Sequence, residues 1–313
     1  MPTKIAAHFS ATRVTKHAFE RLRYCRKCES FTSLRQENCP NCKRKRTFQP
    51  VSQMGLTRSR LGLAIEIVLL AAITITAAAL AQNDAELYAS IICGAALVTA
   101  HLFLRARYSA SIKQYRLYRT LISKIRRIAD GLDADEKIAE LDYEEGHYKA
   151  CYEKLRETGH FLFDDRLRNN KVLCLNRFEL RKDMNLELET VVPRKFSKPF
   201  NTYLLEVSKV SPELIREHTL DYVLRHRAEI EKRNHGKELL TNITSAALRR
   251  RSNFVFCQYL IADYAEFLPR DRFYRLCAML TDHSNESYPG LLSRVKEIAI
   301  THYPSDPEII NLL

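Results

Sequence analysis

The 313-residue sequence has no tryptophan, only 8 glycines and only 10 prolines. So few glycines and prolines exclude a collagen-like chain and a low-complexity chain rich in these residues. A hydrophobic fraction of 46% also excludes general disorder, because disordered chains contain too few apolar residues to bury a core. The sequence signatures of serine hydrolases, zinc metalloproteases, P-loop nucleotide-binding proteins and dinucleotide-binding folds are missing as well. We therefore predict no catalytic residue and do not favour an enzyme.

Positive charge is absent from one central stretch and concentrated on both sides of it. Residues 61–104 contain no Lys or Arg and 3 acids. Residues 1–60 contain 14 Lys and Arg with 3 acids, and residues 105–128 contain 8 Lys and Arg with no acid. The rest of the chain has a net charge of −3, whereas a nucleic-acid-binding domain usually carries its own basic excess. Basic flanks around an apolar stretch are typical of a membrane segment.

The central stretch contains two apolar runs, Leu61–Ala81 and Leu87–Leu104. A helix needs roughly 17–25 mostly apolar residues to cross a bilayer, so each run is long enough. Two buried helices of a soluble core are the alternative. Because only residues 82–86 join the runs, the pattern favours a hairpin of two transmembrane helices.

The orientation of this hairpin is predicted from its flanks. Arg58 and Arg60 precede the first run and Arg105 and Arg107 follow the second, whereas the connecting residues 82–86 contain no positive charge. Since cytoplasmic flanks carry the excess of Lys and Arg, we expect an integral membrane protein with two spans, both termini in the cytoplasm and an external loop at 82–86.

Two ionisable residues lie within the apolar runs, Glu66 and His101. They lie 18 and 17 positions from Asp84, so an antiparallel hairpin that turns near Asp84 brings them to similar depth. One interpretation is a pair that relays protons or lines a pore. The interpretation that we favour is a pair near the interface that holds the hairpin together.

Four of the nine cysteines form two CxxC pairs, Cys25 with Cys28 and Cys39 with Cys42, separated by ten residues. Four soft thiolate ligands in such pairs suit a closed tetrahedral zinc site, which has no open position for catalytic water. The segment around residues 25–42 resembles a zinc ribbon built from two rubredoxin-type knuckles, and CPNC is a common form of the second knuckle. Disulfides need an oxidising compartment, and a redox CxxC pair usually accompanies a βαβ unit, so structural zinc is preferred.

Basic residues lie close to these cysteines and to the membrane. Lys43, Arg44, Lys45 and Arg46 form a continuous run, and Arg105 and Arg107 follow the second apolar run. They are candidates for contacts with anionic lipid or with nucleic acid. As the partner of the ribbon, we rank a protein first, lipid second and nucleic acid third.

The segments that surround the ribbon and follow the hairpin complete the organisation. Residues 1–24 read as a tail or helix, with a mitochondrial presequence as the alternative, and residues 47–60 as a basic linker after a ribbon at 25–46. Residues 105–130 predict a basic stalk helix that ends at Asp130-Gly131. Its apolar stripe begins at Tyr108, Ile112 and Tyr115, and it packs either within the chain or against a second copy.

Residues 131–313 read as an all-α cytosolic domain. Apolar residues recur at spacings of three and four, and Pro269, Pro289 and Pro307 each occur where a new helix is expected to begin. The segment 134–158 resembles a tetratricopeptide unit through Gly146-His147-Tyr148, Cys151 and Leu155. No second copy follows at a 34-residue period, so both a helical solenoid and an irregular helical arrangement stay open.

Together these features predict a mainly α membrane protein with a zinc ribbon, a transmembrane hairpin and a C-terminal helical domain. Its expected function is that of a membrane-anchored adaptor or scaffold, which binds a protein partner through the helical domain and the ribbon. The alternative is a homo-oligomeric membrane effector or pore that the cytosolic domain gates. A third hypothesis is a tether that holds nucleic acid or ribosomes at the membrane.

Overall fold

The computed structural model describes residues 4–54, 56–184, 186–281 and 289–312, with the side chains of 56–61, 63 and 289 left out, so those of the flanking Arg58 and Arg60 lie outside the description. The chain divides into two compact units. Val14–Asp135 form the first, which we call the ribbon–hairpin unit. Met1–Arg13 and Glu136–Leu313 form the second, which we call the helical unit.

The ribbon–hairpin unit begins with a small antiparallel sheet of three strands in the order β2-β1-β3. Its strands are β1 (Arg23–Cys25), β2 (Phe31–Thr32) and β3 (Phe48–Pro50), with 3-10 turns η1 (Ala18–Arg21) before them and η2 (Val51–Gln53) after them. In the register of the sheet, Tyr24 lies opposite Phe31, and Cys25 lies opposite Phe48. The residues that we expected to be a linker, 47–60, therefore contribute the third strand, and the expected boundary at residue 24 lies inside β1.

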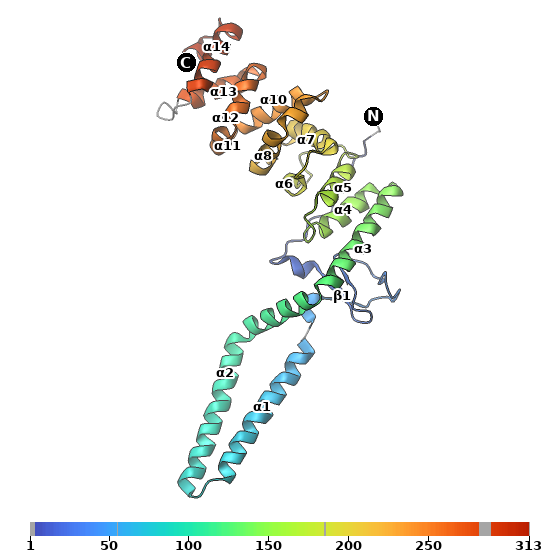
Figure 1. Cartoon of the computed structure of the whole chain (residues 1–313), viewed down its shortest axis with the longest axis vertical. Coiled ribbons are helices and arrows are strands. Elements are labelled where there is room, and N and C mark those ends of the chain that lie inside the picture. Colours follow the sequence, from blue (N-terminus) through green and yellow to red (C-terminus); the bar gives the residue numbers. More distant parts are fainter. Residues whose placement is uncertain (1–3, 55, 185, 282–288, 313) are drawn as a thin grey trace. The chain divides into compact units, whose positions relative to one another are not determined.

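Two antiparallel helices follow the sheet, α1 (Leu56–Ala79) and α2 (Asp84–Ser123), and they pack against each other (Figure 1). The turn between them is closed by Glu86, whose carboxylate accepts a 2.9 Å hydrogen bond from the backbone N–H of Gln82. Asp84 and Glu86 both lie in the first turn of α2, where negative charge is favourable.

Of the described helices, α2 is the one that is long and apolar enough to cross a membrane. Only 6% of its apolar stretch is buried in the structure, whereas a core helix of a soluble protein is mostly buried. In α1, the apolar part that qualifies is shorter, Ala64–Ala79. Its outward side chains are also exposed, with Val68, Ile73 and Ile75 between 63% and 68% accessible.

The absence of a side chain at Gly94 lets α2 pack closely against Thr74 of α1. A Cβ atom at this position would lie 2.2 Å from Cγ2 and 2.6 Å from Oγ1 of Thr74. The Thr74 hydroxyl is held in place because it donates a 2.9 Å hydrogen bond to the carbonyl of Leu70. Gly94 belongs to the small residues that let two apolar helices approach closely.

After a one-residue break at Lys124, α3 (Ile125–Glu144) continues the chain and leads from the first unit into the second. The helix end that we expected at Asp130-Gly131 is not observed, and Gly131 lies inside α3. A Cβ atom there would lie 2.2 Å from the carbonyl oxygen of Phe31 in β2. Glycine is therefore present because a strand of the ribbon packs against the helix, not because the helix stops.

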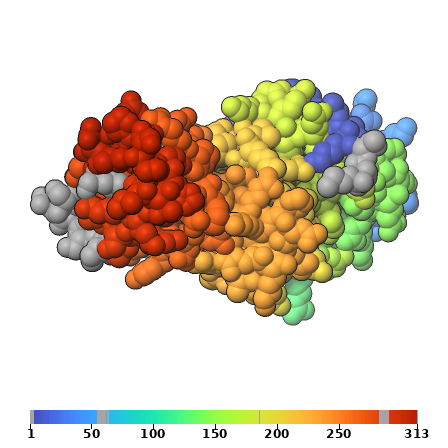
Figure 2. Space-filling view, turned by 90° about the horizontal axis from the view of Figure 1, so that it is seen from above, coloured from blue at the N-terminus to red at the C-terminus, as the bar shows by residue number. Residues whose placement is uncertain are grey.

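The helical unit is built from helices that pack in chain order. Each of α4, α5, α7, α10, α12 and α14 contacts the next, and the shorter helices and turns lie between them. Figures 1 and 2 show this progression from α5 to the C-terminal helices. The bounds are α4 (Tyr148–Thr158), α5 (Asp165–Leu175), α6 (Leu188–Val191), α7 (Lys198–Val210), η3 (Pro212–Leu214), α8 (Glu217–Arg225), α9 (Arg227–Glu231), α10 (Gly236–Ala247), α11 (Arg251–Phe256), α12 (Gln258–Tyr264), η4 (Ala265–Phe267), α13 (Arg270–Thr281), α14 (Pro289–His302) and α15 (Pro307–Ile310).

The first residues of the chain belong to this unit rather than to the ribbon. Ile5 forms a parallel bridge with Phe178, and its N–H donates a 2.9 Å hydrogen bond to the carbonyl of Arg177. Phe9 is 7% exposed, and its ring centroid lies 4.7 Å from that of Tyr152 and 5.3 Å from that of Phe178. Burial of one aromatic ring stabilises a folded protein by roughly 1.5–3 kcal/mol. This gain explains why the segment packs in the helical unit and not on the ribbon.

The contact at Gly94 leads to a first prediction. Gly94→Ala is expected to destabilise the packing of α1 on α2 by about 1–3 kcal/mol, because the added methyl group overlaps Thr74. Gly62→Ala is the matched control, since no atom lies within 4 Å of a Cβ at that position. Thermal unfolding in detergent measures both variants. Equal melting temperatures for the two, or no rescue of Gly94→Ala by Thr74→Ala, would contradict this packing.

Candidate metal centre

The two CxxC pairs form two turns with the same backbone hydrogen bonds. In the first turn, the N–H of Glu29 donates to the carbonyl of Cys25 at 2.9 Å, and the N–H of Cys25 donates to the carbonyl of Ser30 at 2.9 Å. In the second turn, the N–H of Lys43 donates to the carbonyl of Cys39 at 2.8 Å, and the N–H of Cys39 donates to the carbonyl of Arg44 at 3.0 Å. The second turn therefore repeats the first at an offset of 14 residues.

The residue that follows each CxxC pair adopts a left-handed backbone conformation, with φ of 55° at Glu29 and 60° at Lys43. This conformation costs a non-glycine residue about 1–2 kcal/mol, and glycine would adopt it freely. Both turns have this unfavourable conformation at the equivalent position. It reverses the direction of the backbone after each CxxC pair, which helps to bring the four cysteines together.

The four sulfur atoms lie close enough together to bind one metal ion. All four Sγ atoms are within 4.8 Å of one another, with Cys25 and Cys42 3.7 Å apart and Cys28 and Cys39 3.5 Å apart. A tetrahedral zinc ion with Zn–S bonds of about 2.3 Å places its sulfurs about 3.8 Å apart. The cluster of four predicted cysteines is therefore confirmed, and its donor set suits a thiophilic ion.

Hydroxyl groups lie within hydrogen-bond distance of these sulfurs. The hydroxyl of Thr47 lies 3.1 Å from Sγ of Cys25, and the hydroxyl of Ser30 lies 3.1 Å from Sγ of Cys28 and 3.3 Å from Sγ of Cys39. Burial opposes ionisation of Cys25, but Thr47 and the backbone N–H groups of the turn lower its pKa to about 6. The backbone hydrogen bond at Arg44 lowers the pKa of Cys42, but burial and the neighbouring sulfurs outweigh it and raise that pKa to about 11. A divalent cation relieves this crowding of negative charge.

The ribbon is fastened to α3 by one buried carboxylate. Asp135 is 1% exposed and accepts hydrogen bonds from the Thr32 hydroxyl at 2.7 Å, the Ser33 N–H at 2.6 Å and the Ser33 hydroxyl at 2.9 Å. Burial raises the pKa of Asp135, and these hydrogen bonds oppose that shift. Sequence reasoning missed this residue, because a single Asp more than a hundred positions from its partners has no local pattern.

A second, exposed contact joins the same parts of the unit. The carboxylate of Glu29 accepts a hydrogen bond from Nζ of Lys124 at 2.8 Å and another from the guanidinium of Arg127. The Lys124 hydrogen bond, together with Arg127, lowers the pKa of Glu29. Glu29, which has the left-handed backbone in the first CxxC turn, thus also contacts the junction of α2 and α3.

The predicted basic run lies on the outside of the second CxxC turn. Lys43, Arg44, Lys45 and Arg46 are all exposed. The strand-like bridge between Asn38 and Lys45, and a 2.8 Å hydrogen bond from the Arg46 N–H to the carbonyl of Glu37, hold the run in place. The four cations are therefore presented to solvent on an ordered turn.

The predicted ionisable pair of the hairpin also comes together. Nε2 of His101 lies 3.3 Å from Oε2 of Glu66, and the guanidinium of Arg105 donates a hydrogen bond to the same carboxylate oxygen. Arg105, which we predicted as a contact for lipid or nucleic acid, pairs with Glu66 across the two helices. Arg107 is exposed, as that prediction requires.

A weaker group of potential ligands occurs in the helical unit, where one ligand atom each from Asp142, Glu145 and His147 lie within 4.8 Å of one another. Asp142 already forms a 2.6 Å ion pair with Lys154, and His147 is paired with Glu145 at 3.3 Å. This group fits a solvated helix end.

Comparison with family models, with curated proteins and with solved structures finds no match to this chain. Its geometry is therefore the basis for assigning a function.

The sulfur geometry leads to a second prediction. The purified protein is expected to bind one metal ion per chain, with zinc favoured by four thiolates, and Cys25→Ser or Cys39→Ser should abolish this binding. Cys93→Ser is the control, because Cys93 is an exposed cysteine outside the cluster. Elemental analysis by mass spectrometry gives the stoichiometry. A metal content that Cys25→Ser leaves unchanged would refute the site.

The buried carboxylate leads to a third prediction. Asp135→Asn is expected to destabilise the ribbon–hairpin unit by about 1–3 kcal/mol, because an amide NH₂ replaces an acceptor where three donors converge. Asp133→Asn is the control, since Asp133 is exposed on the same helix. Amide hydrogen exchange of residues 23–50 reports the effect. Equal protection in both variants would show that Asp135 does not hold the ribbon.

Proposed function

We propose that this protein is a membrane-anchored scaffold, in which the zinc ribbon stiffens the base of the anchor and the helical unit binds an acidic segment of a partner protein. The observation that carries the proposal is the continuity of α2. One unbroken helix runs from the exposed apolar stretch into the basic stalk, and α3, which follows it, is fastened to the ribbon through Asp135. The anchor and the ribbon are therefore connected through α2 and α3, and both belong to the ribbon–hairpin unit.

The anchor in this proposal is the hairpin of α1 and α2, with both helices crossing the bilayer and both termini in the cytoplasm. The basic residues on both flanks and the exposed apolar faces of the two helices support it. The close contact at Gly94 also supports it, since lipid-facing helices associate through small residues. The metal in this proposal is zinc, and its role is structural because four thiolates leave no open coordination position.

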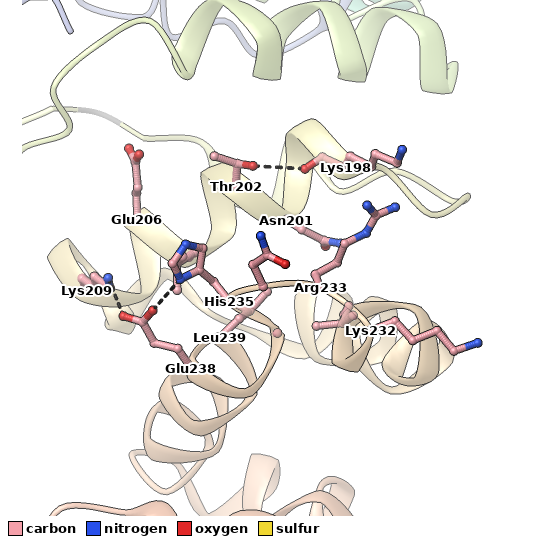
Figure 3. A pocket seen from close by; sticks show the side chains of 14 residues that line it. Lys198, Asn201, Thr202, Glu206, Lys209, Lys232, Arg233, His235, Glu238 and Leu239 are labelled. Carbon is pink, nitrogen blue, oxygen red and sulfur yellow. Dashed lines mark hydrogen bonds and ion pairs between the residues drawn. The ribbon is translucent and has the colours of Figure 1, made fainter. Parts of the chain in front are cut away.

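A groove in the helical unit offers the partner site. It has a volume of about 510 Å³ and is lined by α7 and by the segment from α9 into α10 (Figure 3). Its two carboxylates are already engaged, because Glu206 pairs with Lys4, and Glu238 pairs with Lys209 at 2.6 Å and with His235 at 3.3 Å.

Three cations of the groove remain available. Lys198, Lys232 and Arg233 are exposed and form no ion pair within the described residues. The groove is therefore locally basic on a part of the chain whose net charge is negative, since residues 129–313 carry −3. An acidic peptide segment complements this charge, and charge complementarity of this kind selects partners and speeds their association.

The alternative of a pore that uses Glu66 and His101 is less well supported by the geometry. Arg105 neutralises the Glu66 carboxylate, and the pair lies at the basic end of the hairpin. An ion pair between the two helices fits a role in holding the hairpin together.

A fourth prediction tests the partner site. The double variant Lys198→Glu, Arg233→Glu is expected to lower recovery of the partner about tenfold or more, because like charges then face each other across the interface. The measurement is crosslinking in native membranes, followed by identification and quantification of the crosslinked proteins and nucleic acids.

The matched control is Lys149→Glu, Lys182→Glu, which reverses two exposed charges elsewhere on the helical unit. All variants should stay in the membrane fraction after alkaline extraction. A partner yield that both double variants reduce equally would count against the groove, and recovery in the soluble fraction would count against the anchor.

A further inference from the structure

The part of α2 beyond its apolar stretch exposes a row of aromatic and aliphatic side chains. Tyr108, Ile112, Tyr115, Tyr118 and Ile122 are between 38% and 66% exposed. At 100° per residue, these five positions fall within an arc of about 120° on one side of the helix. We call this row the stalk stripe. An apolar stripe of this size is unfavourable on a helix that faces only water. We therefore expect a second molecule or a membrane surface to cover it.

Cations flank the stalk stripe on both sides. By the same helical geometry, Arg107 lies about 20° beyond one edge and Arg116 about 40° beyond the other, and Arg119 lies within the arc, close to Ile112. All three are exposed, and within the described residues none of them forms an ion pair. No acidic residue occurs between residues 105 and 128.

A shallow groove runs beside the stripe. It has a volume of about 320 Å³, and Phe19 of η1 forms one wall opposite Tyr115, Tyr118 and Leu121 of α2. Aromatic rings with a polar edge suit the boundary between an apolar and an aqueous phase better than either phase alone.

The charge of the stalk decides between two occupants. A second copy of the helix would bring 8 further Lys and Arg against the 8 already present on residues 105–128, with no acid on either to compensate. Within the chain, Glu66 pairs with Arg105, and Glu29 pairs with Lys124 and Arg127. An anionic bilayer surface compensates the other five, and each Lys or Arg near such a surface contributes about 1 kcal/mol. Amphipathic helices that lie on membranes combine an apolar face with a basic one in this way.

The position of the stalk stripe along the chain also favours the membrane surface. The stripe begins four residues after Leu104, the last residue of the second apolar run, and α2 bends over its last part (Figure 1). From Tyr108 to Ile122 the stripe is about 21 Å long at 1.5 Å per residue. A bent helix can lay this length along the membrane into which its first part inserts.

We propose that the stalk, residues 105–123, docks through the stalk stripe on the anionic surface of the membrane, with tyrosine rings at the headgroup level and Arg107, Arg116 and Arg119 on lipid phosphates. The proposal rests on the membrane anchoring proposed above and adds a second contact with the same bilayer. Its consequence is that anionic lipid controls the angle of the stalk to the membrane.

The absence of tryptophan makes a direct test possible, because a single introduced tryptophan is the only one in the protein. Tyr115→Trp places the reporter in the stripe. The full-length variant is reconstituted in phosphatidylcholine vesicles with brominated acyl chains, with or without phosphatidylglycerol. Bromine should quench the fluorescence strongly when phosphatidylglycerol is present, weakly when it is absent, and less at high salt, because salt screens the arginines.

Two further reporters separate this proposal from the anchor itself. Ala110→Trp lies on the opposite side of the stalk helix and should be quenched little in either vesicle. Leu97→Trp lies in the apolar part of α2 and should be quenched in both. If the Leu97→Trp variant is not quenched, the membrane anchor fails. If it is quenched, but Tyr115→Trp is quenched no more than Ala110→Trp, the anchor stands and the docking of the stalk is overturned.

Neutralising the flanking cations tests the chemistry. In the Tyr115→Trp background, Arg107→Gln, Arg116→Gln and Arg119→Gln together should remove the dependence on phosphatidylglycerol, with a loss of about fivefold in stalk association for each arginine. Lys149→Gln, Lys182→Gln and Lys296→Gln remove three exposed charges from the helical unit, away from the groove, as a control. Quenching of the stripe reporter that follows protein density in the vesicle rather than lipid charge would indicate a second copy and overturn the proposal.

Discussion

The contact between the Asp135 carboxylate and the chain at Thr32 and Ser33 is the interaction on which the ribbon–hairpin unit depends. A sheet of three short strands is marginal by itself, and a small ribbon has little apolar core to add. A metal ion can hold the four cysteines together, but it does not attach them to anything else. The three hydrogen bonds to Asp135 provide that attachment, and they carry a cost, since burial disfavours the charged form of the carboxyl group.

The features that sequence predicted well are those whose information is local. The spacing of the CxxC pairs predicts a four-thiolate site because each turn brings two sulfurs together, whatever the rest of the chain does. The long apolar stretch and the proline positions are local too, and α14 and α15 begin at Pro289 and Pro307 as expected. The helical character of residues 131–313 follows from the same kind of pattern.

The features that sequence did not predict involve residues far apart in the chain. Gly131 looked like the end of a helix, because glycine often ends helices. Its actual role is to admit the backbone of Phe31 against α3, which no pattern around residue 131 reveals. The third strand, β3, was not predicted, because three residues are too few to show the alternating pattern of a strand. The Glu66–His101 pair could be placed from hairpin geometry. The ion pair of Arg105 with the same carboxylate was not predicted, because the basic neighbours of Arg105 suggest a contact with lipid or nucleic acid.

The packing of Phe9 in the helical unit determines the order in which the parts of the chain can fold during synthesis. The helical unit is discontinuous, since its first thirteen residues are separated from the rest by the whole ribbon–hairpin unit. The ring of Phe9 cannot reach Tyr152 and Phe178 until both apolar helices have been synthesised and have left the ribosome. Completion of the helical unit therefore comes after synthesis of the hairpin. If the hairpin inserts as it is made, as the proposed function requires, a finished groove appears only on molecules whose hairpin has already been synthesised.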